Sequence, residues 1–339
     1  MPDTVRITLD EIRELSTEVF VANGMSRTNA GVIADVVTTA EADGTHSHGL
    51  FRVPGYVSSM RNGRVDGKAV PEVSDPAPGL VAVDTGNGFS PPAIVAGRPL
   101  AVEKARSQGI AAMGLRNNGN LNALWWDVEQ FGAAGLIAVA MSTTRSLVAP
   151  WGGDRALFGT DPIAFACPRE GKPPMGFDFA TSVAARGEIM VAAREGHDIP
   201  EGWALDRDGK PTTDAKAALE GVQLPLGAHK GNALIIMVEL LAAGLTGGNF
   251  CFEAEQQARE FGAIDGGPSN AGEIIILMDP AGYHGAFLDR IEGLFDRILA
   301  QDGTRLPGDR RYAHRARAMA EGVDCPAGLY QQILDMKAG

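Results

Sequence analysis

The sequence predicts a soluble globular protein in which α-helices and β-strands are combined. The 339 residues are 45% hydrophobic, enough to bury one large core or two smaller ones. Short apolar runs typical of buried strands occur together with amphipathic segments that carry helix-capping signals. The sequence contains no internal repeat or low-complexity linker, so any domains should be interleaved and closely packed.

The predicted helices are recognised mainly by their ends. Thr8-Leu9-Asp10-Glu11 is a capping box, and it predicts a helix that continues to about Ala22 and is closed by Gly24. Ser26 begins a second helix that should run to about Asp43. Further helices are predicted over residues 92–107, which Gly109 ends, over residues 231–244, and from Tyr312 onward.

The predicted strands are short apolar runs. They cover residues 80–84, 110–115, 136–141, 162–167, 176–179 and 274–278. The segment 83–91 follows the first of these strands and contains Gly86-Asn87-Gly88, as a dinucleotide fingerprint would. Pro91 stands where the third glycine should be, and no suitably placed acidic residue follows, so we do not predict a Rossmann site.

Composition excludes several classes of partner. A net charge of -12 disfavours nucleic acids and anionic membranes, because both require a basic protein surface. No apolar run approaches the roughly 20 residues that span a bilayer, and the first residues lack the pattern of a signal peptide, so we expect a cytoplasmic protein. Cys167, Cys251 and Cys325 are odd in number and widely spaced, which predicts buried thiols.

The segment 44–56, GTHSHGLFRVPGY, carries the most chemistry. His48, Arg52 and Tyr56 follow one another at four-residue steps, so a helix beginning near Ser47 would place all three on one face. Histidine titrates near neutral pH and arginine binds carboxylates through paired hydrogen bonds. This face would suit a small acid whose neighbouring atom gains or loses a proton.

Other roles remain open for the same residues. His46 and His48 could be half of a metal site, although a third ligand at recognisable spacing is missing. Ser47 could be the N-cap of the helix, and Arg52 could make only a surface ion pair. Pro54 indicates that the helix is kinked or restarts there, which makes Tyr56 the least secure member of the face.

Two glycine-rich segments are candidate phosphate sites. Residues 227–231, GAHKG, precede a predicted helix, so free backbone N–H groups and Lys230 could meet an anion there. Residues 303–311 combine a turn with Arg305, Arg310 and Arg311, which would suit a phosphate. The alternative in both cases is a surface turn with solvated side chains.

Several long strings together resemble a known family. They are GTHSHGLFRVPGY, DFATS at 178–182, PLGAHKG at 225–231, MVELLAAGLTGGNF at 237–250 and RLPGDRRY at 305–312. They are similar to the type-2 malate/L-lactate dehydrogenase family, and the likeness runs through nearly the whole chain. NALWWDVE, LFGTDPIAF and AAREG, with RLPGDRRY, most resemble the Δ1-piperideine-2-carboxylate/Δ1-pyrroline-2-carboxylate reductases within that family.

The resemblance implies an α+β fold with a non-Rossmann NAD(P)-binding domain, built on a largely antiparallel sheet over residues 116–299. It also implies a mostly helical substrate and dimerisation domain made of residues 1–115 with 300–339. The expected protein is a homodimer that binds a small-molecule substrate and NADPH, with NADH as the alternative cofactor.

The resemblance also implies roles for individual residues. His48 matches the proton donor, Ser47 the residue grouped with it, and Glu188 the carboxylate that orients the imidazole. The expected substrate contacts are Arg52, Thr160, Arg186 and Gly187. No metal ligand is expected. The expected cofactor contacts are Asn120, Leu121, Asn122, Ala123, Leu124, Asp178, Phe179, Ala180, His229, Lys230, Gly303, Thr304, Arg305, Leu306, Pro307, Gly308 and Asp309.

Three positions depart from the reductase pattern. Asn120 lies in a loop where many relatives carry histidine, so His48 remains the main candidate for proton transfer. Glu188 stands where the reductases carry aspartate, and its extra methylene shifts the carboxylate. Arg186 replaces a histidine, which adds a second clamp or alters the accepted substrate size.

These expectations lead to one preferred function. The protein would reduce Δ1-pyrroline-2-carboxylate or Δ1-piperideine-2-carboxylate with NADPH, giving L-proline or L-pipecolate. A 2-oxo acid dehydrogenase of the malate/L-lactate type is the alternative, since reducing a carbonyl uses the same parts. A metal-dependent hydrolase using His46 and His48 and an inactive NADPH-binding protein are less favoured.

Overall fold

The computed structural model describes residues 3–260, 270–283 and 285–337. Its centre is a seven-stranded sheet in the order β2-β3-β4-β11-β5-β6-β7. All neighbours are antiparallel except β3 and β4, so the sheet is mixed but largely antiparallel, as expected. The strands are β2 (Glu72–Ala77), β3 (Leu80–Asp84), β4 (Ile110–Asn118), β5 (Ile137–Ser142), β6 (Ile163–Arg169), β7 (Lys172–Phe179) and β11 (Ala271–Met278).

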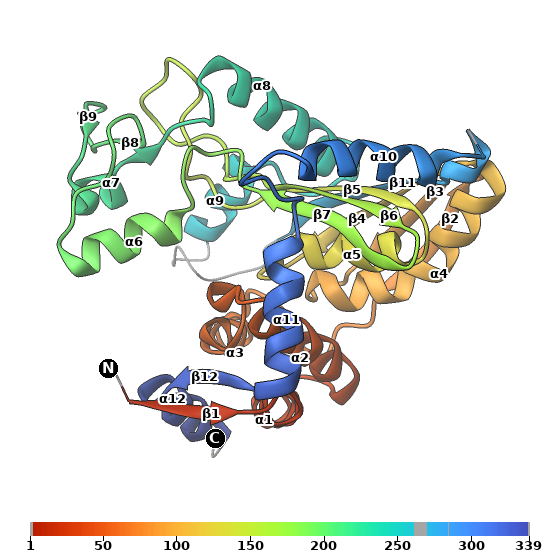
Figure 1. Cartoon of the computed structure of the whole chain (residues 1–339). Coiled ribbons are helices and arrows are strands. Elements are labelled where there is room, and N and C mark those ends of the chain that lie inside the picture. Colours follow the sequence, from red (N-terminus) through yellow and green to blue (C-terminus); the bar gives the residue numbers. More distant parts are fainter. Residues whose placement is uncertain (1–2, 261–269, 284, 338–339) are drawn as a thin grey trace.

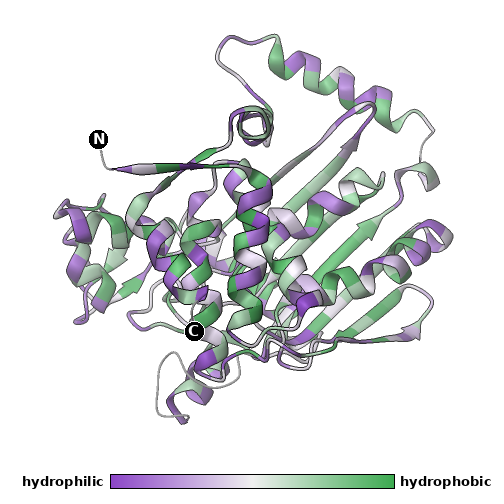
Figure 2. Ribbon diagram, turned by 90° about the horizontal axis from the view of Figure 1, so that it is seen from below, coloured by the Kyte–Doolittle hydropathy of each residue, from purple (hydrophilic) through white to green (hydrophobic). Residues whose placement is uncertain are grey.

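Helices cover both faces of this sheet (Figure 1). Helices α4 (Ser90–Gln108) and α5 (Trp125–Ala133) pack on one face. The other face carries α8 (His229–Val238), which continues as the π-helix η3 (Glu239–Gly244), and α10 (Phe287–Leu299). The strands are largely hydrophobic along their length (Figure 2), and the core between sheet, α4 and α5 includes the fully buried Met113, Leu115 and Phe131.

A second core is mostly helical and unites the two ends of the chain. It contains α1 (Leu9–Ala22), α2 (Arg27–Ala42), α3 (Val53–Arg61) and α12 (Ala327–Lys337). Strand β1 (Thr4–Ile7) pairs antiparallel with β12 (Val323–Pro326), so both termini lie beside this core (Figure 1). Helix α11 (Asp309–Glu321) connects the helical part to the sheet.

A small lobe lies beyond β7 and carries a three-stranded sheet. It consists of α6 (Arg186–Glu195), β8 (Ala204–Leu205), β9 (Pro211–Thr212), α7 (Ala215–Glu220) and β10 (Val222–Gln223). The remaining elements are the 3-10 turns η1 (His46–His48), η2 (Leu50–Arg52) and η4 (Pro280–Gly282), and helix α9 (Cys251–Glu260).

The capping predictions are confirmed. In α1 the Thr8 N–H donates to the Glu11 carboxylate at 2.8 Å, and the Glu11 N–H donates to Thr8 Oγ1 at 3.2 Å. Ser26 is the N-cap of α2, and Gly109 ends α4 in the left-handed conformation with φ +80°. Local sequence was sufficient here because a cap satisfies backbone groups within one helical turn.

Some predicted boundaries are wrong. The helix expected from Ser47 to Tyr56 is two separate 3-10 turns followed by α3, which begins only at Val53 with Pro54 in its first turn. Proline is tolerated in a first turn, so Pro54 starts this helix and does not kink it. The helix expected from Gly231 begins at His229.

The expected division into two domains stays a prediction, but the central sheet extends across the expected boundary. Strands β2 and β3 precede residue 116, and the expected boundary between residues 115 and 116 falls inside β4. Cys167, Cys251 and Cys325 are free and buried, as predicted. None of the helices in the described residues is long and apolar enough to cross a membrane.

A buried ion-pair network joins the helical part to the sheet. Asp43, the C-cap of α2, receives Arg315 Nε at 2.6 Å and Arg311 Nη1 at 3.0 Å. Glu129 on α5 receives the same two arginines at 2.6 and 2.9 Å. Arg311 also stacks over Trp125 at 4.2 Å from the ring centroid. The arginines lie four residues apart on α11, so both reach both carboxylates.

We expect Asp43→Ala to lower the free energy of unfolding by about 3–5 kcal/mol, because it leaves two largely buried guanidinium groups short of a partner. Asp35→Ala on the same helix removes only the exposed pair with Arg13 and should cost less than about 1 kcal/mol. Urea denaturation of both variants measures the difference. Equal stabilities would contradict the structural role given to the network.

Candidate active site

The candidate site lies along one edge of the sheet, where it faces the helical part. Because most neighbouring strands are antiparallel, the C-terminal ends of β4, β5 and β7 meet the N-terminal ends of β6 and β11 at this edge. Residues 120–124 follow β4, Thr144 follows β5, Thr160 precedes β6, and residues 178–180 end β7. Four separate chain segments therefore reach one place.

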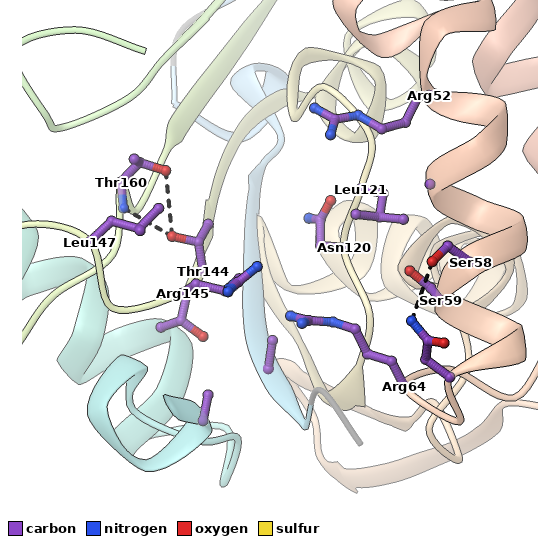
Figure 3. Close-up of a pocket in the computed structure, with 15 residues that line it drawn as sticks. Arg52, Ser58, Ser59, Arg64, Asn120, Leu121, Thr144, Arg145, Leu147 and Thr160 are labelled. Carbon is purple, nitrogen blue, oxygen red and sulfur yellow. Dashed lines mark hydrogen bonds between the residues drawn. The ribbon is translucent and has the colours of Figure 1, made fainter. Parts of the chain in front are cut away.

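Two adjoining cavities occupy this edge, with volumes of about 430 and about 440 Å³. The first brings together most of the predicted site: Ser47, His48, Arg52, Asn120, Leu121, Asn122, Ala123, Leu124, Thr160, Asp178, Phe179, Ala180, Arg186 and Gly187. The second is lined by Arg52, Arg64, Arg145, Ser58, Ser59 and others, and Figure 3 shows its side chains converging from α3 and from the sheet edge. The cavities share Arg52, Asn120, Leu121, Thr144, Leu147 and Thr160, so they are continuous.

His48 is held at the wall of the first cavity. Its Nδ1 lies 3.1 Å from Ser47 Oγ, so the two residues that were predicted to act together are joined by a hydrogen bond. Burial, and then the positive charge of Arg52, lower the pKa of His48 from 6.5 to about 4. The imidazole is therefore neutral at pH 7 while the cavity holds no anion.

A buried glutamate fixes the two turns that carry His48 and Arg52. Glu41 Oε1 accepts the Leu50 N–H at 2.7 Å, and Oε2 lies 2.6 Å from His46 Nδ1. This bond raises the pKa of His46. A Cβ at Gly49 would lie 2.2 Å from Glu41 Oε1, so only glycine allows the approach. Glu41 thus sets the direction in which both functional side chains project.

The structure does not support the metal site considered from the sequence. His46 is engaged by Glu41, and no third ligand joins it and His48 among the described residues. The one candidate ligand cluster in that part of the chain is Asp161, Glu239 and Cys251.

Tyr56 is not part of the site. Its ring is fully buried in the helical core and makes edge contacts with Phe20 at 5.6 Å and Phe89 at 5.0 Å between ring centroids. Burial raises the pKa of its hydroxyl. The predicted common face of His48, Arg52 and Tyr56 is therefore wrong, because the turns before α3 break the helical spacing.

Several predicted residues lie outside the cavities. Glu188 is exposed in the first turn of α6, and within the described structure its side chain makes no hydrogen bond, whereas His48 pairs with Ser47. His229 and Lys230 are exposed at the start of α8, whose N-cap makes no side-chain hydrogen bond. The turn 303–309 leads into α11, where Leu306 N–H donates to Asp309 at 2.8 Å. The roles of these residues stay predictions.

One expectation about the phosphate candidates needs correction. Arg311 was expected to be available to a phosphate, but it is engaged by Asp43 and Glu129 and covers Trp125. Arg305 and Arg310 are exposed. The sequence gives no sign of this difference because Asp43 and Glu129 are distant along the chain.

Sequence reasoning missed a buried group that positions the cavity wall. Asp161 Oδ1 accepts the Thr144 N–H at 3.2 Å and Cys251 Sγ–H at 3.2 Å. Thr144 Oγ1 in turn accepts the Thr160 N–H at 2.9 Å (Figure 3). Burial raises the pKa of Asp161 to about 6. The signal available was an aspartate directly after the predicted substrate contact Thr160.

A second missed group lies beneath the loop that follows β4. Asp127 and Glu273 are both completely buried, and Asn122 donates to Asp127 at 2.9 Å. Asn120 donates to Glu273 at 3.4 Å and to Ser142 at 3.3 Å. Burial and the neighbouring Glu273 raise the pKa of Asp127 well above its usual value. Burial raises the pKa of Glu273 as well, so the protonated form of both carboxyl groups is favoured beneath the loop.

Comparison with known proteins shows the family of this chain. The malate/L-lactate dehydrogenase family model matches residues 7–334. The chain belongs to this family and is an oxidoreductase. It is 47% identical, over 94% of its length and 93% of the relative's, to a Δ1-pyrroline-2-carboxylate/Δ1-piperideine-2-carboxylate reductase of Pseudomonas syringae pv. tomato.

The chain is also similar to a solved structure and to a second curated relative. The crystal structure of a Δ1-piperideine-2-carboxylate reductase from P. syringae superposes with a TM-score of 0.92 at 43% identity, covering 98% of this chain and all of that one. An NADP(+)-dependent (2R)-3-sulfolactate dehydrogenase of Chromohalobacter salexigens is 41% identical over 96% of both chains.

The first cavity fits the nicotinamide cofactor that a dehydrogenase family implies. Leu121, Ala123, Leu124 and Ala180 give it an apolar wall, and the apolar ring of Phe179 is 39% exposed there. A flat ring placed against this wall would share the cavity with His48. The apolar wall and the His48 imidazole thus line the same cavity, as hydride and proton transfer to one substrate requires.

We expect Arg52→Gln to raise the pKa of His48 above about 4, although not to 6.5, because burial remains. A folded-state pKa below 6.5 costs stability as the pH falls from 6.5 toward 4, since the unfolded chain binds the proton first. That loss should be smaller in the variant. NMR titration of the imidazole measures the pKa.

The matched control is Arg61→Gln, which removes an equal charge at an exposed position on α3. It should leave the pKa of His48 near its starting value. If Arg52→Gln also leaves it unchanged, the two side chains are not electrostatically linked.

Proposed function

We propose that this protein uses NADPH to reduce the C=N bond of Δ1-pyrroline-2-carboxylate and Δ1-piperideine-2-carboxylate, giving L-proline and L-pipecolate. The observation that carries the proposal is the first cavity, in which His48, Arg52, Thr160 and the predicted cofactor segments 120–124 and 178–180 line one enclosed space. The relatives named for these two substrates support the same reaction.

Arg52 binds the substrate carboxylate in this proposal. Its guanidinium Nε is buried and has no hydrogen-bond partner in the described structure, so a bound carboxylate would supply one. The carboxylate would also offset the positive charge that lowers the pKa of His48. Substrate binding therefore favours the protonated imidazole that the reaction needs.

His48 donates the proton. When bound, the reduced nicotinamide supplies the hydride that C2 of the imine accepts. The imine nitrogen takes the proton from His48, whose Nδ1 is held by Ser47. Glu188 completes the proposed set only if α6 brings it closer to the imidazole, since its side chain is exposed here. Thr160 and Gly187 would contact the substrate from the opposite wall.

The remaining cofactor contacts extend away from this cavity. His229 and Lys230, at the uncapped start of α8, would meet a phosphate group through backbone N–H groups and positive charge. Residues 303–309 lie beside β7, because Tyr312 donates to Pro174 at 2.8 Å just after the turn. Preference for NADPH over NADH rests on this turn and on the NADP(+)-dependent relative.

We also propose a cytoplasmic homodimer. Exposed apolar side chains gather along α8 and η3, where Ile236, Met237 and Leu240 are 41%, 37% and 58% exposed. Such a face is typical of one that a second copy covers.

The reaction is tested by following oxidation of NADPH and NADH with both cyclic imines, pyruvate and oxaloacetate. We expect the cyclic imines with NADPH to give the highest kcat/KM. Amino-acid analysis should then find proline or pipecolate as the product. Turnover confined to the 2-oxo acids would overturn the imine proposal.

A 2-oxo acid dehydrogenase is the second candidate. A specific observation favours it: Arg186 lines the cavity together with Arg52, so two guanidinium groups border the substrate space. The relative named as a sulfolactate dehydrogenase acts on a 2-hydroxy acid. The same assay separates the two candidates.

We expect His48→Ala to lower kcat by about 10²–10⁴-fold, the usual contribution of a general acid, while NADPH still binds. His197→Ala, an exposed histidine after α6, should retain full activity. Steady-state kinetics and fluorescence titration with NADPH provide the two readouts. An active His48→Ala enzyme would exclude this residue as the proton donor.

A further inference from the structure

The loop that follows β4 is anchored on two carboxyl groups from distant parts of the chain. Asn122 Nδ2 donates to Asp127 Oδ1 at 2.9 Å, and Asn120 Nδ2 donates to Glu273 Oε2 at 3.4 Å. Within the loop, the Asn122 N–H donates to Asn120 Oδ1 at 3.1 Å. Asp127 lies in the first turn of α5 and Glu273 lies on β11, so the loop is tied to a helix and to the sheet at once.

The backbone of β11 directs Glu273 toward the side of the sheet that α4 and α5 cover. Side chains alternate along a strand, and Ile274 packs in the core near η3 whereas Ile275 packs in the core with α4 and α5. Gly272 lies so close to η3 that a Cβ there would be 1.8 Å from Ala242 O. Glu273 therefore projects on the same side as Ile275, into a mostly apolar layer.

The two carboxyl groups are completely buried and are hydrogen-bonded to each other. Two carboxyl groups can make such a bond only when one of them carries a proton. Asp127 Oδ2 and Glu273 Oε1 accept no hydrogen bond from an N–H or O–H group in the described part of the chain, and the shared proton supplies a donor.

The surroundings of the pair offer no balancing positive charge. The titratable groups that act on it from other elements of the described structure are Asp178 at the end of β7 and Tyr56 on α3, and neither is a cation. Burial raises the pKa of Glu273 to about 7, and burial together with the neighbouring Glu273 raises that of Asp127. The neutral, proton-sharing form of the pair is therefore the one that this environment favours.

The loop 120–124 forms much of the wall that the two cavities share. All five of its residues line the first cavity, and Asn120 and Leu121 also line the second (Figure 3). Its apolar side chains belong to the wall against which the nicotinamide ring is placed. The position of this wall depends on Asn120 and Asn122 and, through them, on two carboxyl groups that line neither cavity.

We propose that Asp127 and Glu273 are positioning residues for the cofactor, and that together they hold the loop 120–124 in the conformation that receives the nicotinamide ring. The pair performs this role while it shares a proton. Ionisation of Glu273 leaves an unbalanced charge beneath the loop, which draws water into the core and loosens the anchors of Asn120 and Asn122. The inference rests on the proposed function, because it takes the loop to be part of the cofactor site.

Glu273→Leu removes one anchor at similar volume. We expect the Kd of NADPH to rise about tenfold, roughly the value of one buried hydrogen bond, while kcat at saturating cofactor falls less than about threefold. Glu273→Gln keeps an acceptor for Asn120, so at pH 6 its Kd should stay within about twofold of the wild-type value. A wild-type Kd in Glu273→Leu would overturn the inference.

Asn29→Leu is the matched control for a loss of buried hydrogen bonds. Asn29 donates to Gly67 O and to Ala69 O at 3.0 Å and lines neither cavity. This variant should be less stable in urea, yet bind NADPH with the wild-type Kd. An equal rise of Kd in Asn29→Leu and Glu273→Leu would show a general effect of destabilisation and would also overturn the inference.

A pH series distinguishes positioning from a merely structural role. As the pH rises through about 7 the Glu273 carboxyl ionises, whereas Glu273→Gln stays neutral. The ratio of the wild-type Kd of NADPH to that of Glu273→Gln should therefore increase at least about threefold between pH 6 and pH 8. Titration of the cofactor phosphate is common to both proteins and cancels in this ratio. A ratio independent of pH would contradict the role of the shared proton, and the comparison does not require Glu273→Leu to fold.

These binding measurements use fluorescence of NADPH and need no turnover, so they separate the inference from the proposed function. An enzyme that shows the expected Kd values but reduces no imine would overturn the proposed reaction alone. An enzyme that reduces the imines while Glu273→Leu binds NADPH as tightly as the wild type would overturn the positioning role alone.

Discussion

The active site depends on the ion-pair network that fixes the helical part against the sheet. His48 and Arg52 come from the helical part, whereas Asn120, Thr160, Asp178 and Arg186 come from the sheet edge and the lobe beyond it. Asp43 at the end of α2 and Glu129 on α5 are paired with the same two arginines of α11. Separating α2 from α5 would break these ion pairs and leave largely buried charges without a partner. Groups that line neither cavity therefore hold the helical part and the sheet together.

Acidic and basic side chains occupy different places around the cavity, and this difference affects the protonation of His48. Asp127, Asp161 and Glu273 are buried near the cavity, and burial raises the pKa of each of these carboxyl groups. Guanidinium groups, in contrast, line the open space itself. Burial and the charge of Arg52 thus favour a neutral His48, and an anionic ligand that offsets this charge would raise the pKa of the imidazole. Substrate charge and proton supply are coupled through Arg52.

Much of the fold and of the site could be predicted from the sequence. The capping box at Thr8, the N-cap Ser26 and the strand at residues 80–84 act locally, and the structure contains all three. The segment 44–56 was predicted to carry site residues, and His48 and Arg52 line the cavity. The predicted helical face is wrong, because Glu41 and Gly49 impose two 3-10 turns there. Arg311 was expected to bind phosphate, and only the folded chain shows that two distant carboxylates engage it.

The sequence by itself determined helices α1, α2 and α4 and six strands of the central sheet. It also determined the resemblance to a dehydrogenase family and the side chains available for acid–base work and carboxylate binding. It could do so because caps, periodicity and motifs are properties of neighbouring residues. The tertiary structure alone decided which charges are paired and which face the cavity. Burial and Coulomb interactions depend on groups far apart in the chain, as Arg311 shows by pairing with Asp43 and Glu129.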